Sequence, residues 1–211
     1  MGDHWNAFIT RVDPSPAVES PGTGPLAGRT LGVKDLFDTA GIRTTYGSRL
    51  YRDHVPYRTA LSVQRLLDAG AVLVGKTHLP EFAWSVMGQS DWYGTCHNPT
   101  APGRTTGGSS SGSGAALAAG LCDLALGTDT GCSIRLPSAA CGVVGLKTQW
   151  GRISLDGVFP LCPTLDTVGP MARSGEDVAL MCALLSERRG PEPRLGGLTL
   201  AFLRQPPGSC D

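Results

Sequence analysis

Lysine and serine are the residues whose positions in this chain could support nucleophilic chemistry. A short run of small residues, Thr106 to Gly114, carries four serines. On composition alone this run resembles a flexible linker, yet it continues directly into the helix-forming alanines of 115–119. A serine hydroxyl becomes an effective nucleophile when a neighbouring base removes its proton. The first question is therefore which residue could be that base.

Histidine, the most frequent base, does not fit the order of residues. The run contains Gly108-Ser109-Ser110-Ser111-Gly112, which matches the G-x-S-x-G pattern of a nucleophile elbow. That turn needs an apolar strand before the serine, whereas residues 98–106 are polar and contain two prolines. The elbow's triad also places histidine last, and all four histidines precede Ser110 (positions 4, 54, 78 and 97). We expect surface or structural histidines without metal-ligand spacing, and a supporting role for His97 at the serine loop stays open.

Lys34 is the best candidate for the base. It follows a short apolar segment, Leu31 to Val33, that predicts a strand, and functional groups of α/β folds gather at strand ends. A buried lysine can accept a proton near neutral pH because burial lowers its pKa toward ~7–8. The alternative is a surface lysine paired with Asp35.

A second segment, 127–137, follows another predicted strand and places small residues immediately before Ser133. A tight turn there would aim successive backbone N–H groups at one point, as an oxyanion hole requires. The alternative is a plain turn whose serine and threonine side chains satisfy local hydrogen bonds.

The segment Gly70 to Thr77 matches the G-x-x-x-x-G-K-[ST] phosphate loop letter for letter. In a phosphate loop the variable residues form a loop whose N–H groups face phosphate, but here they are Ala-Val-Leu-Val, which predicts a strand. Pro80 also stands where the following helix should run. We interpret the segment as a buried strand followed by a surface turn, not as a nucleotide site.

Helical and apolar segments alternate along the chain, which favours an α/β layered fold. Residues 1–24 predict an irregular lead-in, and the Gly/Pro/Ser/Thr-rich stretch 94–114 predicts a loop. Strands are expected over 31–33, 71–74, 124–126 and 198–203, and helices over 59–69, 81–86, 115–119 and 175–189. Ser174 and Asp177 predict a capping box at the start of the last helix.

The composition limits the possible partners and compartment. The 18 basic and 18 acidic residues cancel without long runs of either sign, so we expect neither a nucleic-acid groove nor a membrane-binding patch. Seven cysteines without C-x-x-C spacing indicate free thiols in a reducing compartment. With neither a signal peptide nor an apolar run of about 18 residues in view, we expect a cytoplasmic protein.

Longer stretches of the sequence resemble a known family. Residues 105–154, "TTGGSSSGSGAALAAGLCDLALGTDTGCSIRLPSAACGVVGLKTQWGRIS", are similar to the signature block of the amidase signature family. The similarity extends to "PLAGRTLGVKDLFDTAGIRTTYGS" (25–48), "LLDAGAVLVGKTHLPEFA" (66–83), "YGTCHNP" (93–99) and "LDTVGPMARSGEDVAL" (165–180). The resemblance implies an α/β fold with a mixed central sheet covered by helices. It also implies one domain, with 25–190 as its family-like core.

The resemblance implies a Ser–Ser–Lys relay instead of a histidine triad. The family's lysine corresponds to Lys34, its bridging serine to Ser109, which follows a cis peptide bond in the family, and its nucleophile to Ser133. The implied oxyanion donors are the backbone N–H groups of Thr130, Gly131, Cys132 and Ser133. The implied reaction is hydrolysis of a small-molecule carboxamide through an acyl-enzyme, with neither a cofactor nor a metal.

Several departures from the family pattern leave alternatives open. Cys132 stands where the family usually has glycine, so it would strain the loop if that position needed a positive φ, and its thiol could itself be the nucleophile. Ser111 and Thr148 replace a usual glycine and a usual proline.

The chain is also about half the usual family length, so we expect a C-terminally truncated domain. The alternatives to a small-molecule amidase are a protein similar to the A subunit of a tRNA-dependent amidotransferase and an inactive truncated homologue. A homodimer or a partner subunit would be compatible with these readings.

Overall fold

The computed structural model describes residues 3–13, 22–186, 197 and 199. The strand expected over 198–203 lies outside the described residues except for Thr199, and so does the expected end of the last helix at Arg189.

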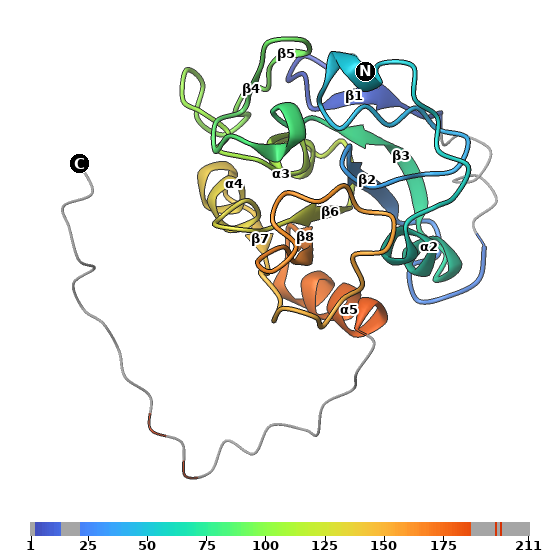
Figure 1. Ribbon diagram of the computed structural model, residues 1–211. Coiled ribbons are helices and arrows are strands. Elements are labelled where there is room, and N and C mark those ends of the chain that lie inside the picture. Colours follow the sequence, from blue (N-terminus) through green and yellow to red (C-terminus); the bar gives the residue numbers. More distant parts are fainter. Residues whose placement is uncertain (1–2, 14–21, 187–196, 198, 200–211) are drawn as a thin grey trace.

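A six-stranded mixed sheet forms the centre of the molecule, with the strand order β1-β3-β2-β6-β8-β7 (Figure 1). The middle strands β3 (Val72–Thr77), β2 (Thr30–Lys34) and β6 (Leu124–Thr128) are parallel. On the outside β1 (Phe8–Arg11) runs antiparallel to β3, β8 (Val168–Ala172) to β6, and β7 (Val144–Gly145) to β8. This mixed α/β architecture confirms the fold class predicted from the resemblance.

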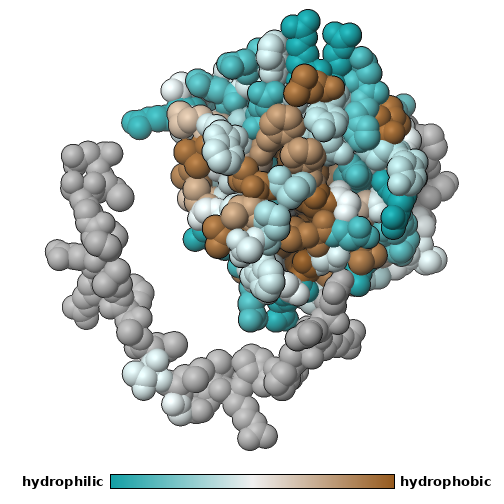
Figure 2. Space-filling model, viewed as in Figure 1, coloured by the Kyte–Doolittle hydropathy of each residue, from teal (hydrophilic) through white to brown (hydrophobic). Residues whose placement is uncertain are grey.

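Apolar side chains also reach the surface beside the β7 edge. Figure 2 shows apolar residues gathered in the middle of one face, where the 151–166 segment lies in Figure 1, and toward its left side, where α4 (Arg135–Cys141) and β7 lie. We call the following exposed residues the apolar face: Leu136, Val144, Leu146, Trp150 and Leu165. Trp150 is held there because its indole Nε1 donates to the Pro163 carbonyl at 3.1 Å.

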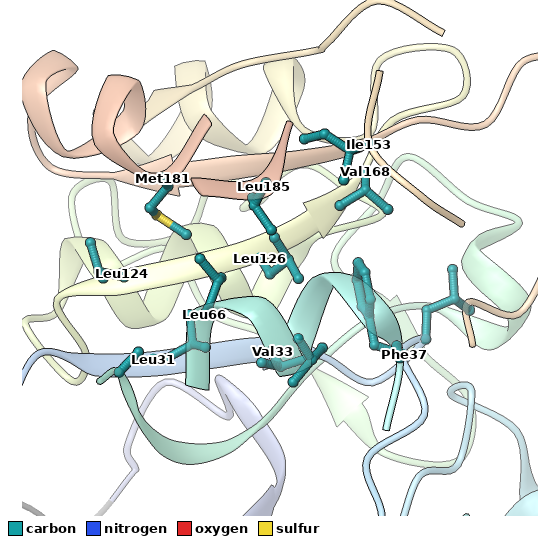
Figure 3. Packing of buried hydrophobic residues seen from close by; sticks show 14 of the residues in the cluster. Leu31, Val33, Phe37, Leu66, Leu124, Leu126, Ile153, Val168, Met181 and Leu185 are labelled. Atoms are coloured by element: carbon teal, nitrogen blue, oxygen red, sulfur yellow. The ribbon is translucent and has the colours of Figure 1, made fainter. Parts of the chain in front are cut away.

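Alternation along the central strands separates two buried clusters. Leu31 and Val33 of β2 belong to the cluster under α2 (Leu61–Asp68) and α5 (Gly175–Leu185) (Figure 3). Successive strand residues point to opposite faces, so Gly32 and Lys34 face the other side. That side is covered by α3 (Ser111–Ala118), whose Ala115 and Ala116 pack with Ala125 and Met171, and by Ile134, the residue before α4. The apolar pattern of β2 thus directs Lys34 toward α3.

Most predicted elements are confirmed. The helix over 59–69 is α2, and Gly70 follows it with φ +97°. The strand over 71–74 is the first part of β3. The helix expected over 81–86 is reduced to a short 3-10 turn, Glu81–Ala83, in which Phe82 and Ala83 have positive φ. Ser174 caps α5, since its hydroxyl accepts the Asp177 N–H at 3.2 Å. A second 3-10 turn, Arg49–Tyr51, begins after Ser48.

Three expectations are wrong. The lead-in 1–24 is not wholly irregular, because β1 pairs with β3. The loop predicted over 94–114 begins with the strand β5 (Gly94–Thr95), which pairs with β4 (Gln89–Ser90) just before it, and ends with the start of α3. The helix begins at Ser111, not at Ala115. Close packing explains this start, since a Cβ on Gly112 would lie 2.2 Å from both the Ala7 carbonyl oxygen and the His78 nitrogen. Tertiary contact overrides the low helix propensity of glycine.

Among the described helices none is long and apolar enough to cross a membrane. Within the same residues, no group of three or more His, Cys, Asp or Glu side chains could hold a metal ion.

Candidate active site

Lys34 lies at the end of β2 with its side chain fully buried. Its Nζ donates to the Ser109 Oγ at 2.8 Å and to the Thr128 Oγ1 at 2.8 Å. The alternative of a surface lysine paired with Asp35 is therefore wrong. Asp35 instead forms an ion pair with Lys76, at 3.2 Å between Oδ1 and Nζ.

A bulge in β3 keeps the two buried lysines apart. The pairing of β2 with β3 shifts by one residue between Leu31 and Gly32, so Val33 pairs with Lys76 and Lys34 with Thr77. Paired residues on neighbouring strands share a face, which places Lys76 on the Val33 side of the sheet. There Lys76 donates to the Phe37 carbonyl and the Thr44 hydroxyl, each at 2.6 Å. Lys76 belongs to the segment that matches the phosphate-loop pattern. The surface turn expected there is wrong, because Lys76 and Thr77 are buried residues of β3. A lysine buried within a strand is consistent with our interpretation that this segment is not a nucleotide site.

Burial lowers the pKa of Lys34 to about 7, against the attraction of the Asp129 and Asp166 carboxylates, which would raise it. Desolvation disfavours the charged ammonium, and the groups that contact Nζ directly are uncharged hydroxyls. A substantial fraction of Lys34 is therefore neutral near pH 7, as a proton acceptor must be.

Ser109 is held in a buried turn made of small residues. Its peptide bond with Gly108 is cis, in agreement with the feature that the family resemblance implies. Gly107 has φ +69°, and a Cβ on Gly108 would lie 2.9 Å from the Met87 carbonyl oxygen. Glycine at these positions lets the loop pack against the backbone around Met87.

Ser133 lies beside this turn at the start of α4, and only 6% of its surface is exposed. The Ser110 N–H donates to the Ser133 carbonyl at 3.1 Å, and this hydrogen bond joins the turn of Ser109 to the segment before α4. The Ser133 hydroxyl makes no hydrogen bond with a described residue, so its link to Ser109 is not a direct hydrogen bond in this structure. Hydrogen bonds of a catalytic relay often tighten only in the complex with substrate.

The neighbouring Ser110 has a structural role. Its hydroxyl is buried and donates to the Thr128 carbonyl at 3.3 Å. The side chain that matches the G-x-S-x-G pattern is therefore already bonded within the fold.

The backbone before α4 presents a row of free N–H groups. Those of Thr130, Gly131, Cys132 and Ser133 donate to no acceptor in the part of the chain that the structure describes. The next two N–H groups, of Ile134 and Arg135, both donate to the Asp129 Oδ2, at 3.1 and 3.2 Å. The free donors are the ones that the resemblance assigned to an oxyanion hole.

Asp129 organises this loop from inside. Burial alone would raise the pKa of the Asp129 carboxyl, but hydrogen bonds from Arg135 and from the Ile134 N–H outweigh burial, and the pKa is lowered. The Asp129 carboxylate accepts the Arg135 Nε at 3.1 Å, while its carbonyl accepts the Lys147 Nζ at 2.6 Å. Because it stays ionised, it holds the turn by charge-assisted hydrogen bonds.

Cys132 fits the loop in an ordinary backbone conformation. The described non-glycine residues with positive φ are Asn6, Tyr46, Phe82 and Ala83. Since Cys132 is not among them, the strain expected for a side chain at this position does not arise.

An apolar cavity of about 160 Å³ adjoins the loop and is lined by Thr128 and Thr130 on one side. Its other walls come from Leu36 and from residues between Leu155 and Asp166. Asp166 fixes the boundary, since it accepts the Thr130 hydroxyl at 2.5 Å and the Leu161 and Cys162 N–H groups at 2.9 Å.

Comparison with known proteins identifies the family, since the amidase family model matches residues 11–194. The chain belongs to the amidase signature family. Two similar relatives are glutamyl-tRNA(Gln) amidotransferase A subunits. The one from Natronomonas pharaonis is 45% identical over 201 residues, which are 93% of this chain and 47% of the relative. The one from Thermus thermophilus is 48% identical over 169 residues, covering 80% and 35%.

Solved structures of amidase signature enzymes share the fold. A peptide amidase from Stenotrophomonas maltophilia superposes with a TM-score of 0.82 at 37% identity, covering 90% of this chain and 42% of that one. The amidotransferase A subunit from Thermotoga maritima gives a TM-score of 0.82 at 36% identity, covering 88% and 40%. The chain thus spans less than half the length of these amidase signature proteins.

Sequence reasoning missed three contributors to this amidase-like site: Thr128, Asp129 and Asp166. Thr128 and Asp129 end β6 and follow it, so the rule that strand ends carry functional groups could have found them. Asp166 gave no such signal, because its contact with Thr130 joins loops 36 residues apart. His78 is a structural histidine, since burial lowers its pKa to about 4 and its ring contacts Ser111 and the Gly94 carbonyl.

Proposed function

We propose that this chain carries the nucleophile, relay and oxyanion donors of an amide hydrolase, with Lys34 as base, Ser109 as relay and Ser133 as nucleophile. The observation that carries the proposal is the fully buried Lys34 amine 2.8 Å from the Ser109 hydroxyl, in a turn hydrogen-bonded to the backbone of Ser133. A neutral amine placed in this way can remove a hydroxyl proton.

The proposed first half-reaction forms an acyl-enzyme. Neutral Lys34 accepts the Ser109 proton, Ser109 accepts the Ser133 proton, and the Ser133 Oγ attacks the amide carbonyl carbon. The carbonyl oxygen gains the negative charge and accepts the N–H groups of Thr130, Gly131, Cys132 and Ser133, which have no acceptor among the described residues. This step requires the Ser109 and Ser133 hydroxyls to come into contact when substrate binds.

The proposed second half-reaction returns the enzyme to its starting state. When the C–N bond breaks, the nitrogen takes a proton back from the relay and leaves as ammonia or an amine. Water then gives a proton to the same relay and attacks the Ser133 ester, which releases the carboxylic acid and the free serine. The residues proposed to react supply all the proton transfers, so the reaction as written uses neither a cofactor nor a metal.

The proposed substrate is a small carboxamide with a compact apolar acyl group. The cavity beside Thr128 and Thr130 supports this class, because its remaining walls are largely apolar and its volume is about 160 Å³. The free thiols of the described cysteines support a reducing compartment, and we propose the cytoplasm.

Labelling with a fluorophosphonate tests the nucleophile. The Ser133 Oγ is expected to displace fluoride from phosphorus, and peptide mapping should place the label on Ser133. Ser133→Ala should abolish the label and Lys34→Ala should slow its formation. Cys132→Ser controls for the adjacent thiol and should keep the label. A label on Cys132 or Ser110 would contradict the site, and a folded sample without any label would favour the inactive homologue.

A second candidate is an amidotransferase component that acts together with partner subunits. Relatives about 45% identical are A subunits of glutamyl-tRNA(Gln) amidotransferases, and the apolar face lies beside α4, close to the proposed oxyanion loop. Ammonia release from glutamine and from simple amides, measured with and without candidate partner subunits, separates this candidate from a free amidase. Activity on simple amides without a partner would favour the amidase.

A further inference from the structure

A cavity of about 570 Å³ lies outside the proposed active site, and its lining does not include Lys34, Ser109 or Ser133. Its walls come from the segment before β1, from the β4–β5 hairpin and from residues 102–105. The side chains with chemistry to offer are His4, Trp5, Gln89, His97 and Arg104. The volume is in the range of small-molecule sites.

Backbone hydrogen bonds fix the frame of this cavity. The His97 N–H donates to the Trp5 carbonyl at 2.8 Å, and the Cys96 N–H donates to the Gly88 carbonyl at 2.7 Å. The Asn98 side-chain amide donates to the Thr105 carbonyl at 3.0 Å. These hydrogen bonds join the segment before β1 to the stretch 88–105 and brace that stretch internally, so several contacts support the cavity walls.

The lining offers hydrogen-bond donors but no carboxylate. The lining contains neither Asp nor Glu, and the Arg104 guanidinium has no ion-pair or hydrogen-bond partner among the described residues. The same holds for the Gln89 amide and the His97 ring in the described part of the chain. Asp3, on the adjoining segment, already accepts the Ala7 and Phe8 N–H groups at 3.0 and 2.9 Å.

We propose that this cavity binds a small organic anion, with its carboxylate or phosphate group on Arg104 and its apolar part against Trp5 and Met87. An arginine fork recognises either oxyanion by paired N–H donors. The indole and the thioether line the same cavity and give the organic part an apolar wall. His97 and Gln89 supply further donors near the head group.

The position of the cavity connects it to the serine loop. A Cβ on Gly88 would lie 2.0 Å from the Thr106 hydroxyl, and a Cβ on Gly108 would lie 2.9 Å from the Met87 carbonyl. Met87 and Gly88 therefore separate the cavity from the turn that carries Ser109. The proposal itself concerns binding and does not depend on catalysis at Ser133.

Calorimetric titration of the full chain tests the proposal with two probes, benzoate for the carboxylate and phenyl phosphate for the phosphate. At least one probe should bind with a Kd of about 1 mM or tighter, whereas benzyl alcohol, which has no charge, should not bind measurably. Arg104→Gln should weaken binding about tenfold or more, as the loss of a charged hydrogen-bond partner predicts. Arg58→Gln changes an exposed arginine outside this cavity and serves as the matched control, which should bind like the wild type.

The probe that binds with the lower Kd shows whether the cavity prefers a carboxylate or a phosphate head group. Loss of binding in Arg104→Gln but not in Arg58→Gln supports the proposal. Equal affinity in the wild type and Arg104→Gln, equal binding of benzyl alcohol, or no binding of either anion overturns it. Both arginines are exposed, so circular dichroism should show that the two variants fold like the wild type.

Discussion

The two buried lysines of this chain differ in what contacts their amines. Lys34 contacts the hydroxyls of Ser109 and Thr128, whereas Lys76 has the Asp35 carboxylate 3.2 Å away. The Lys76–Asp35 ion pair compensates two buried charges, whereas among the described residues no carboxylate pairs with Lys34. Burial therefore dominates at Lys34 and brings its pKa to about 7, which supports the proposed role of Lys34 as the base, whereas Lys76 has the contacts of a structural residue.

Asp35→Asn should destabilise the fold by about 3–5 kcal/mol, because it leaves the Lys76 ammonium buried without its counter-ion. Urea denaturation measures the change in the free energy of unfolding. Asp53→Asn, at a carboxylate that is 84% exposed, is the control and should change stability by less than about 0.5 kcal/mol. Similar losses in the two variants would contradict a structural role for the Lys76–Asp35 pair.

Cys132→Gly tests whether the unusual residue in the oxyanion loop impairs the site. Because Cys132 does not adopt a positive φ, glycine should relieve no backbone strain. The rate of fluorophosphonate labelling at Ser133 should stay within about threefold of the wild type. A gain of tenfold or more would show that the thiol side chain obstructs the nucleophile.

At the scale of elements, the first turn of α3 packs closely behind the serine turn because Gly112 has no room for a side chain. Gly112→Ala would place a Cβ 2.2 Å from two backbone atoms, so we expect a loss of about 3 kcal/mol or more in the free energy of unfolding. Gly175→Ala is the matched control, since Gly175 begins α5 and has no atom within 4 Å of an added Cβ. Thermal and urea unfolding of both variants measure the difference. Equal stability would contradict the role assigned to this contact.

The sequence predicted the elements that have local patterns. The short apolar run from Leu31 to Val33 predicted β2, and the spacing over 59–69 predicted α2. Neither β8 nor α4 was anticipated, because Gly169 and Pro170 weaken a strand pattern and Pro137 weakens a helix pattern. The pairing of β8 with β6 supplies the stability that local propensity does not.

The residues of the candidate site also differ in whether a local sequence pattern predicted them. Lys34 followed from its place after an apolar strand, whereas Ser109 and Ser133 were chosen by resemblance to a family. The sequence pattern did not reveal Asp129 as the organiser of the loop, because its role depends on hydrogen bonds that exist only in the folded turn. The match of Ser110 to the elbow pattern would have misled a search by motif alone.

At the scale of the whole molecule, the proposed nucleophile, relay, base and oxyanion donors lie within a chain less than half the length of its relatives. The apolar face is exposed beside the β7 edge of the sheet (Figure 2). Contiguous exposed apolar patches mark interaction surfaces or aggregation sites. We therefore expect this face to govern association of the isolated chain.

The double variant Leu146→Gln/Trp150→Gln should reduce self-association of the isolated chain. Light scattering after size exclusion should show a molar mass that rises with concentration for the wild type and stays nearer the 22.0 kDa monomer for the variant. Tyr57→Gln, which changes an exposed aromatic residue away from the apolar face, should behave like the wild type. A wild-type chain that remains a monomer at all concentrations would contradict this expectation.

The most direct test of the proposed site is the pH dependence of fluorophosphonate labelling at Ser133. Only neutral Lys34 can accept a proton, and burial lowers its pKa to about 7. The labelling rate should therefore rise about tenfold per pH unit below this pKa and level off above it. Lys34→Ala should remove this rise and slow labelling by about 100-fold or more. A rate that does not change across pH 7, or equal rates in the wild type and Lys34→Ala, would contradict the assignment of Lys34 as the base.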